Sequence, residues 1–331
     1  MRLAAACFVL LAAWLPKVGE AAAVTFAAFG DMPYCDDRDP DGCRGELARL
    51  EALIGEMNAL RPAFSVFLGD TKAGGERCTD AVVLDRTAAW FARVEGPLVY
   101  TPGDNEWTDC WQDRAGRFDP LERLAKLRER FFAHPLSLGG APRPLVRQSD
   151  TDAEHRLYVE NARWERGGVL FATVHVPGSD NNRPRDGGDG AVPPGAAAEY
   201  PARNRANLAW IAETFARAER EGRGAVVFAL QADLYYRDRC GRGTVEGHLD
   251  TREALVDGAR RYGRPVLLLH GDSHFHLEDR PAPGAPNLTR LMVPGARDLR
   301  AVQVTVDPVA AEPFRFEVIG RADRPARPRC D

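Results

Sequence analysis

Residues 24–31 read VTFAAFGD, a short apolar run that ends in glycine and aspartate. The same ending recurs at residues 64–70 (FSVFLGD) and 98–104 (LVYTPGD). Short apolar runs bounded by turn residues are typical of buried strands. A glycine lets the chain turn sharply after the strand and leaves room beside the next carboxylate. The pattern therefore predicts acidic side chains, Asp31, Asp70 and Asp104, at the ends of three strands.

Segments with helical spacing separate the apolar runs. In residues 46–60 the apolar side chains fall at helical intervals, and the pattern stops before Pro62. Strands that alternate with helices indicate a layered α/β fold, and closely spaced late strands add antiparallel pairs. We therefore expect two mixed sheets packed together with helices outside. The other expected elements are helices at residues 80–94, 121–132 and 203–221 and strands at residues 168–174, 225–230, 265–269, 289–293, 301–306 and 314–318.

The first residues predict an export signal. Arg2 gives a positive start, residues 3–15 are apolar, and residues 21–23 are alanines that suit cleavage after Ala23. The alternative is a buried N-terminal helix. No convincing linker divides the rest, so we expect residues 1–23 to be a signal peptide and residues 24–331 to be a single domain. The mature protein would be periplasmic or secreted, with no stable membrane insertion after cleavage.

Residues 178–201 are rich in Gly, Pro, Asp and Asn, which predicts a long surface loop that could act as a lid or bind substrate. The net charge of -4 does not indicate a nucleic-acid partner, because such proteins carry a basic footprint. The oligomeric state is left open by the sequence.

Six cysteines remain after removal of the signal, and export makes disulfides the expected state. Several pairings are open to six cysteines, and we favour the one in which the first pair closes a short loop and the last pins the C-terminal tail. A thiolate metal site is the alternative, but the chain has no C-x-x-C pair. The favoured pairs are Cys35–Cys43, Cys78–Cys110 and Cys240–Cys330.

Polar side chains follow the predicted strands, and in open α/β sheets binding sites form at the carboxyl ends of strands. Carboxylates and imidazoles are typical ligands of divalent cations. Two cations about 3.5–4 Å apart can clamp a phosphate and activate a water. One Gly-Asp pair alone would indicate only a turn, but the set indicates a site for one or two metal ions. The residues are Asp31, Asp70, Asp104, His175, Gln231, His270, His274 and His276.

The sequence resembles the calcineurin-like metallophosphoesterase superfamily. That family shows, in chain order, Asp-x-His, Gly-Asp, Gly-Asn-His-Asp/Glu, a lone His and Gly-His-x-His. The resemblance implies a four-layer sandwich of two mixed sheets flanked by helices, and hydrolysis of a phosphate ester with Mn, Fe, Zn, Mg or Ca ions as cofactors. The matching segments are residues 30–34 (GDMPY), 69–70 (GD), 103–106 (GDNE), Gln231 and 273–276 (SHFH).

The chain departs from the family pattern at several positions. Pro33 replaces the first His and cannot ligate through its side chain. Asp104 replaces an Asn ligand, and its carboxylate is also an oxygen donor. Asn105 replaces the His that assists catalysis or binds phosphate, and an amide cannot supply a proton near neutral pH. Gln231 replaces the lone His and offers only a carbonyl oxygen, and Ser273 replaces a Gly.

The resemblance implies two ligand sets that share one bridging carboxylate. Both sets hold fewer imidazoles than is usual in the family. We therefore expect one ion to bind tightly and the second weakly or not at all, with harder ions favoured. The sets are Asp31, Asp70 and His276 for one cation, and Asp70, Asp104, Gln231 and His274 for the other.

Four residues near these motifs are assigned catalytic or substrate-binding roles. Asn105 and His175 are the candidate catalytic residues, and Tyr34, Lys72 and Asn105 are the candidate substrate-binding residues. His175 could supply a missing imidazole, although a histidine at a strand end is as often a structural donor. Lys72 could contact a phosphate oxygen, although such a lysine is usually only solvated.

Two functions fit the pattern. The first is an exported phosphoesterase that hydrolyses a small phosphate mono- or diester with metal-activated water. The second is a non-catalytic binding protein that keeps the fold and a degenerate metal site, which the changes at Pro33, Asn105 and Gln231 would suit.

Overall fold

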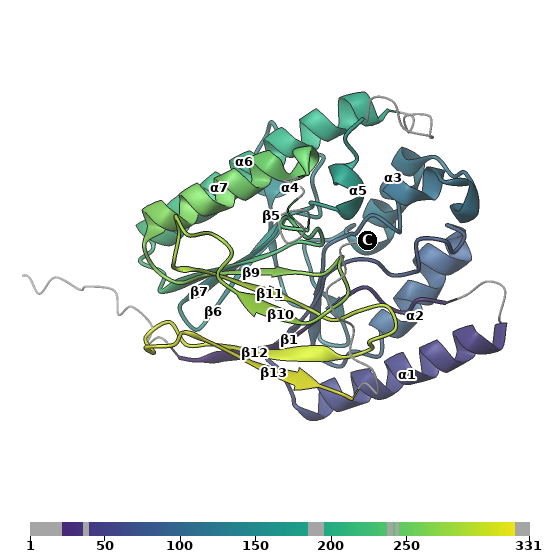
Figure 1. The fold of residues 1–331 in the computed structure, drawn as a ribbon, viewed down its shortest axis with the longest axis horizontal. Coiled ribbons are helices and arrows are strands. Elements are labelled where there is room, and N and C mark those ends of the chain that lie inside the picture. Colours follow the sequence, from purple (N-terminus) through teal and green to yellow (C-terminus); the bar gives the residue numbers. More distant parts are fainter. Residues whose placement is uncertain (1–21, 36–39, 185–194, 237–240, 242–244, 322–331) are drawn as a thin grey trace, which may run out of the picture.

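A computed structural model of the chain describes residues 22–35, 40–184, 195–236, 241 and 245–321. These residues form four layers, with two sheets packed face to face and helices on both outer faces (Figure 1). Helices α6 (Ala196–Arg220) and α7 (Glu246–Tyr262) lie across the top of the view, and α1 (Pro40–Ala59) lies along the bottom. The predicted fold class, two mixed sheets flanked by helices, is confirmed.

The first sheet contains six strands among the described residues, in the order β13-β12-β1-β2-β3-β4. Strands β1, β2 and β3 are parallel, whereas β12, β13 and β4 run antiparallel to their neighbours. Phe67 pairs with Phe29 on one side and Tyr100 on the other, so the three parallel strands end together. The bounds are β1 Val24–Phe29, β2 Ser65–Phe67, β3 Pro97–Tyr100, β4 Leu138–Gly139, β12 Ala301–Val306 and β13 Phe314–Ile319.

The second sheet contains seven strands in the same described part of the chain, in the order β10-β11-β9-β8-β7-β6-β5. Strands β7, β8, β9 and β11 are parallel, and the remaining strands are antiparallel additions at the two edges. Ala229 pairs with Thr173 and Leu269, so these strands also end together. The bounds are β5 Val146–Arg147, β6 Ala162–Arg166, β7 Val169–Thr173, β8 Ala225–Ala229, β9 Val266–His270, β10 Leu277–Asp279 and β11 Leu288–Met292.

Alternate residues of the central strands enter two different cores, as the period of two in a strand requires. Phe26 of β1 and Val227 of β8 lie in the core between the sheets. Phe29 of β1 packs instead on the side of α1, and Val226 of β8 packs on the side of α6 and α7. Burial on both faces explains why these strands read as continuous apolar runs.

The remaining helices connect the strands. Helix α3 (Pro120–Phe131) begins with proline at its first position, and the N-cap Asp119 accepts a hydrogen bond from Leu121 N at 2.8 Å. A π-helical stretch, Ala81–Arg86, leads into α2 (Thr87–Phe91). Short helices α4 (Gln148–Thr151) and α5 (Gly178–Asn181) lie near the carboxyl ends of the second sheet and its edge.

The strands expected at residues 24–29 and 301–306 are present with the same bounds. The loop expected at residues 178–201 is wrong at its C-terminal end, since α6 begins at Ala196, whereas α5 is a short turn with left-handed φ values. Helix α6 contains Pro201, which lacks one backbone N–H donor. The alanines before it are strong helix formers and extend the helix back to Gly195.

Two of the favoured disulfides are confirmed, and the third lies outside the described residues. The export signal also lies outside them except for its last two residues. No helix in the described part of the chain is long and apolar enough to span a membrane. The disulfides present are Cys35–Cys43 and Cys78–Cys110.

Candidate metal centre

The carboxyl ends of both sheets bring acidic side chains to one edge. Asp31 N donates to Gly69 O at 2.9 Å, which ties the loop after β1 to the loop after β2. Asp272 N, after β9, donates to Asp31 Oδ1 at 3.0 Å. A Cβ on Gly69 would lie 2.5 Å from Gly103 N, so glycine lets the loops after β2 and β3 touch. The loops that carry the acids therefore form one packed surface.

Four of the polar residues at this edge have left-handed backbone conformations. The φ values are 55° for Asp31, 61° for Asp70, 74° for Asp272 and 65° for His274. Aspartate and histidine reach this region more easily than most residues, although it costs roughly 1–2 kcal/mol per residue. Strained backbone of this kind clusters at functional sites, where the surrounding structure holds it in place.

Asp31, Asp70 and His274 form a group with the composition of a cation site. Each offers one ligand atom, and these atoms all lie within 4.8 Å of one another. His274 Nε2 lies 3.3 Å from Asp31 Oδ1. Both carboxylates are buried, and Asp31 Oδ2 has no hydrogen-bond partner. A divalent cation would satisfy this orphaned oxygen, so the residues fit a metal ion.

The Asp70 carboxylate receives three hydrogen bonds from its neighbours. Tyr34 OH donates to Oδ2 at 2.8 Å, and Asn105 donates to Oδ2 through Nδ2 (2.7 Å) and to Oδ1 through its backbone N (3.1 Å). Tyr34 OH also lies 3.1 Å from His274 Nε2. The Tyr34 hydroxyl thus contacts two of the three ligand residues, Asp70 and His274.

Glu106 supports the loop beneath Asp70. It accepts hydrogen bonds from Tyr100 OH (2.7 Å), Gly103 N (2.8 Å) and Asp70 N (3.1 Å). The carboxylate is fully buried. It fixes the two Gly-Asp turns relative to each other and is itself surrounded by donors.

A second acidic cluster lies beside the first. Ser179 Oγ lies 2.7 Å from Asp104 Oδ2 and 2.6 Å from Asp109 Oδ1. A hydroxyl has only one hydrogen to donate, so it cannot satisfy two ionised carboxylates. Burial, followed by the charge of Asp104, raises the pKa of Asp109 to about 6. Below that pH Asp109 supplies the second proton.

Electrostatics at this edge disfavour the cation-free state. Burial, followed by the charges of Asp104 and Asp31, raises the pKa of Asp70 well above its ordinary value. Burial and then the charge of Asp104 do the same to the pKa of Asp272. Burial alone would lower the pKa of His274, but its hydrogen bond to Asp31 raises it. Crowded buried carboxylates of this kind are stabilised by a bound cation.

Gln231 and Lys72 both lie at this edge, in arrangements that differ from their expected roles. Gln231 Oε1 accepts a hydrogen bond from Gly178 N at 2.5 Å, and its buried Nε2 has no partner. The side chain thus presents a donor rather than its carbonyl oxygen. Lys72 is fully buried, Nζ donates to Ala73 O at 3.0 Å, and burial lowers the pKa of its ammonium.

The structure places His175 in a different network from the acids. Its Nδ1 lies 2.8 Å from Glu160 Oε1, and Glu160 is also paired with Arg128 at 2.6 Å. The His175 carbonyl accepts a hydrogen bond from Arg203 (3.0 Å), and burial lowers the pKa of the imidazole. Both the side chain and the carbonyl of His175 are held by hydrogen bonds, so this buried residue joins the end of β7 to neighbouring segments.

His276 points away from the ligand group. Its Nε2 lies 2.8 Å from Glu278 Oε1 of β10, because the intervening Phe275 takes the buried position. His270 lies at the end of β9, and its Nδ1 is 3.0 Å from Gly271 O. Of the closing His-x-His pair, His274 is therefore the member that the structure brings to Asp31.

Sequence reasoning misses three polar residues at this edge: Asp272, Asp109 and Ser179. A signal for Asp272 exists, because residues 271–272 (GD) follow a strand in the same way as the three pairs already recognised. Asp109 and Ser179 carry no such signal, since a short 3₁₀ turn and a left-handed turn bring them together.

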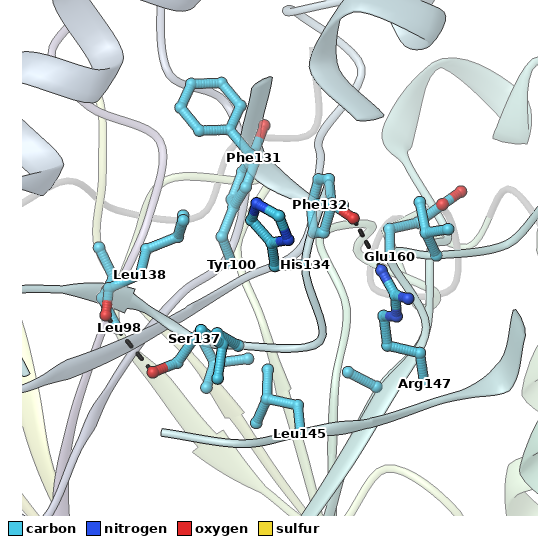
Figure 2. A pocket seen from close by; sticks show the side chains of 14 residues that line it. Leu98, Tyr100, Phe131, Phe132, His134, Ser137, Leu138, Leu145, Arg147 and Glu160 are labelled. Atoms are coloured by element: carbon cyan, nitrogen blue, oxygen red, sulfur yellow. Dashed lines mark hydrogen bonds between the residues drawn. The ribbon is translucent and has the colours of Figure 1, made fainter. Parts of the chain in front are cut away.

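The pocket in Figure 2 lies apart from the acids. It is lined mainly by apolar and aromatic side chains of β3 and of residues 131–138, including Leu98, Phe131 and Leu138. Arg147 closes one side by donating to Phe132 O at 2.9 Å. Its lining offers none of the ligand groups described above.

Comparisons with known proteins leave the family open. No protein-family model matches the sequence, and no curated protein matches it. Among solved structures, the chain is similar to TT1561 of Thermus thermophilus, with 14% identity over 90% of this chain and 98% of that chain, at a TM-score of 0.45. This likeness is too distant to carry an argument about activity, which rests on the residues of the chain itself.

Proposed function

We propose that the chain is an exported, metal-dependent phosphoesterase that hydrolyses a small phosphate mono- or diester. The observation that carries this proposal is the group of Asp31, Asp70 and His274, whose ligand atoms lie within 4.8 Å of one another at the carboxyl edge of the sheets. The orphaned Asp31 Oδ2 and the raised pKa of Asp70 both favour a bound cation. Mn, Fe and Zn suit this mixed oxygen and nitrogen set.

A divalent cation held by these residues would neutralise phosphate charge and lower the pKa of a water. The chain supplies the groups that orient the ester. Asn105 Nδ2 lies 2.7 Å from Asp70 Oδ2 and is a donor suited to a phosphate oxygen. Burial and the charge of Asp70 raise the pKa of Tyr34 well above its ordinary value, so its hydroxyl remains a donor. Lys72 is buried two residues after Asp70, but its Nζ is directed to Ala73 O, so it is not counted among these groups.

The candidate catalytic pair offers no proton for the leaving group. The Asn105 amide does not titrate near neutral pH, and burial lowers the pKa of the His175 imidazole, so the ring is neutral there. Without a general acid, the rate depends on how well the leaving oxygen carries negative charge. We therefore expect aryl esters to be hydrolysed faster than alkyl esters.

The alternative is a metal-binding protein without turnover. Pro33 and Asn105 stand where the resembled family has imidazoles, and Asn105 Nδ2 donates to Tyr34 OH at 2.9 Å. This alternative keeps the cation at Asp31, Asp70 and His274. It differs from the first only in whether an ester is hydrolysed.

A screen of phosphate esters separates the two. The mature protein would be assayed with bis(4-nitrophenyl) phosphate, 4-nitrophenyl phosphate and an alkyl phosphate, each with Mn²⁺, Zn²⁺ or EDTA. Asp70→Asn is the test variant, and Asp257→Asn, in an exposed ion pair on α7, is the control. Turnover that needs the metal and is lost only in Asp70→Asn supports the phosphoesterase. Metal binding without turnover of any ester supports the alternative.

We also propose that cleavage after Ala23 leaves residues 24–331 as one exported domain. The two disulfides are compatible with an oxidising compartment. Strands β1, β12 and β13 from opposite ends of the chain pair in one sheet, which favours a single folding unit. Mass spectrometry of the protein from culture medium or periplasm would test this, and an intact residue 1 would contradict it.

A further inference from the structure

We propose that the chain forms a two-fold symmetric dimer through the free edge of strand β13, so that the first sheet continues into the same sheet of a second copy. The partner at this edge is a second copy because residues 314–319 (FRFEVI) are complementary to themselves when two such strands run antiparallel. The inference does not depend on the proposed function.

Strand β13 differs in length from the strands at the other sheet edges. It has six residues and lies at the end of its sheet, beside β12 (Figure 1). The other edge strands, β4, β5 and β10, have only two or three residues each. A short edge strand hinders pairing with another chain, whereas a long one with free backbone groups favours it. Among the described residues, no strand pairs with the outer side of β13.

The register between β12 and β13 shows which backbone groups of β13 are free. Asp307 N donates to Pro313 O at 2.9 Å, and the pairing continues from there without a break. In an antiparallel pair, residues that exchange hydrogen bonds alternate with residues that do not. Every second residue of β13, counted from Pro313, therefore bonds to β12, and the residues between them direct their N–H and C=O groups to the free edge. These outward residues are Phe314, Phe316 and Val318.

A second copy matches these groups when two β13 strands run antiparallel about Phe316. In that register Phe316 lies opposite the same residue of the second copy, and Phe314 lies opposite Val318 of the second copy. Each opposed pair can exchange hydrogen bonds in both directions, because its backbone groups point outward on both strands. A two-fold axis at Phe316 makes the contact identical from both sides, as a closed dimer requires.

The same register places opposite charges against each other. Arg315 of each copy would lie opposite Glu317 of the other, in the non-hydrogen-bonded pairs that bring side chains closest. Both side chains are available, since they are 69% and 64% exposed. Charged residues on an edge strand ordinarily repel another chain. Here their signs are opposite on either side of the axis, so two copies attract each other.

The apolar side chains of β13 would also gain cover. Phe314 and Phe316 are partly buried and pack against the core between the sheets. Val318 lies on the same face of the strand, because the period of a strand is two, and it is 38% exposed. In the dimer Val318 would pack against Phe314 of the second copy, and apolar cross-strand pairs stabilise a sheet. A contact of one strand is smaller than a permanent interface, so we expect the dimer fraction to rise with protein concentration.

Analytical ultracentrifugation from low micromolar to near-millimolar protein tests the inference with charge reversals. The wild type should shift from monomer to dimer across this range. Arg315→Glu and Glu317→Arg each oppose like charges twice and should weaken the dimer by about tenfold or more. The double variant, with both changes, exchanges the two signs and should restore the wild-type dissociation constant. Arg260→Glu, at an exposed ion pair on α7, is the control and should leave the dimer unchanged.

Val318→Pro tests the backbone contact. It removes an N–H that points to the free edge, a position at which an edge strand tolerates proline. The variant should stay folded and monomeric. Hydrogen exchange, followed residue by residue by NMR, is the second measurement. In the wild type the amides of Phe316 and Val318 should exchange more slowly as concentration rises, whereas the Glu317 amide, bonded to β12, should be protected throughout.

Each result decides the matter. A wild type that stays monomeric at every concentration would overturn the inference. A dimer that survives both Arg315→Glu and Val318→Pro would use another surface, and the inference would be wrong. Slow exchange of Phe316 and Val318 in the monomer would show that the chain covers its own edge, which also overturns it. Asp70→Asn, which tests the proposed function, should leave the dimer unchanged, so the two proposals can fail separately.

Discussion

Replacement of Asp109 by asparagine should stabilise the cation-free protein at neutral pH and have a much smaller effect near pH 4. Asp109 is buried, and Ser179 Oγ lies 2.6 Å from its Oδ1 and 2.7 Å from Asp104 Oδ2. The Ser179 hydrogen is shared by two acids, and Thr108 Oγ1 lies 3.4 Å from Asp109 Oδ1, so an ionised Asp109 has few and weak donors. Asparagine carries its own N–H donor and removes the charge.

The magnitude follows from the pKa. Burial, followed by the charge of Asp104, raises the pKa of Asp109 from 3.8 to about 6. The folded state thus favours the protonated form. The stabilisation from protonated Asp109 is fully present below the pKa that Asp109 has in the unfolded chain. It is lost as pH rises through the pKa that Asp109 has in the folded protein. The loss amounts to about 2 kcal/mol at pH 5 and about 3 kcal/mol at pH 7.

Urea unfolding in EDTA at about pH 4, 5 and 7 would measure this difference, with Asp257→Asn as a surface control. Asp109→Asn should gain about 3 kcal/mol over the wild type at pH 7 and less than about 1 kcal/mol at pH 4. A gain of equal size at all three pH values would show that the charge of Asp109 is not the cause. No gain at pH 7 would refute the reasoning entirely.

Three further changes test the fold around the site. Replacing both Cys78 and Cys110 by alanine opens a loop with a sequence separation of 32 and should cost about 3.7 kcal/mol of unfolding free energy, measured by urea denaturation. Gly55→Ala in α1 should raise stability by about 0.5–1 kcal/mol, and an unchanged melting temperature would contradict this. Glu160→Gln leaves the partly buried Arg128 without its carboxylate partner and should cost about 3–5 kcal/mol by the same measurement, and a loss below about 1 kcal/mol would show that the pair is not needed.

The parts of the fold that sequence predicts are those in which local pattern and tertiary role agree. Strand β1 is short, apolar and ended by glycine, so its bounds and the position of Asp31 follow from the sequence. Helix α7 gives no such signal, because it contains glycines and many charges. Gly258 is required there by packing, since a Cβ would lie 2.1 Å from Phe215 of α6. That contact joins distant segments and is invisible to a local pattern.

The residues of the candidate site are likewise predictable only where the local sequence pattern agrees with their place in the fold. The positions of Asp31, Asp70 and Asp104 are predictable, because each follows an apolar strand and comes directly after a glycine. The environment of His175 cannot be predicted from the sequence, because its partners Glu160 and Arg203 come from other segments of the chain. The residues contributed by turns also escape prediction. Residues 179–182 have φ values of 46°, 56°, 57° and 56°, and only this left-handed run carries the Ser179 hydroxyl to the acids.

Anomalous diffraction from crystals soaked in Mn²⁺ would test the central claim most directly. The account predicts a peak about 2.0–2.3 Å from oxygens of Asp31 and Asp70 and from a nitrogen of His274, with the Tyr34 hydroxyl displaced from between them. A structure with no peak there, in which Tyr34 still donates to Asp70 and His274 still contacts Asp31, would contradict it.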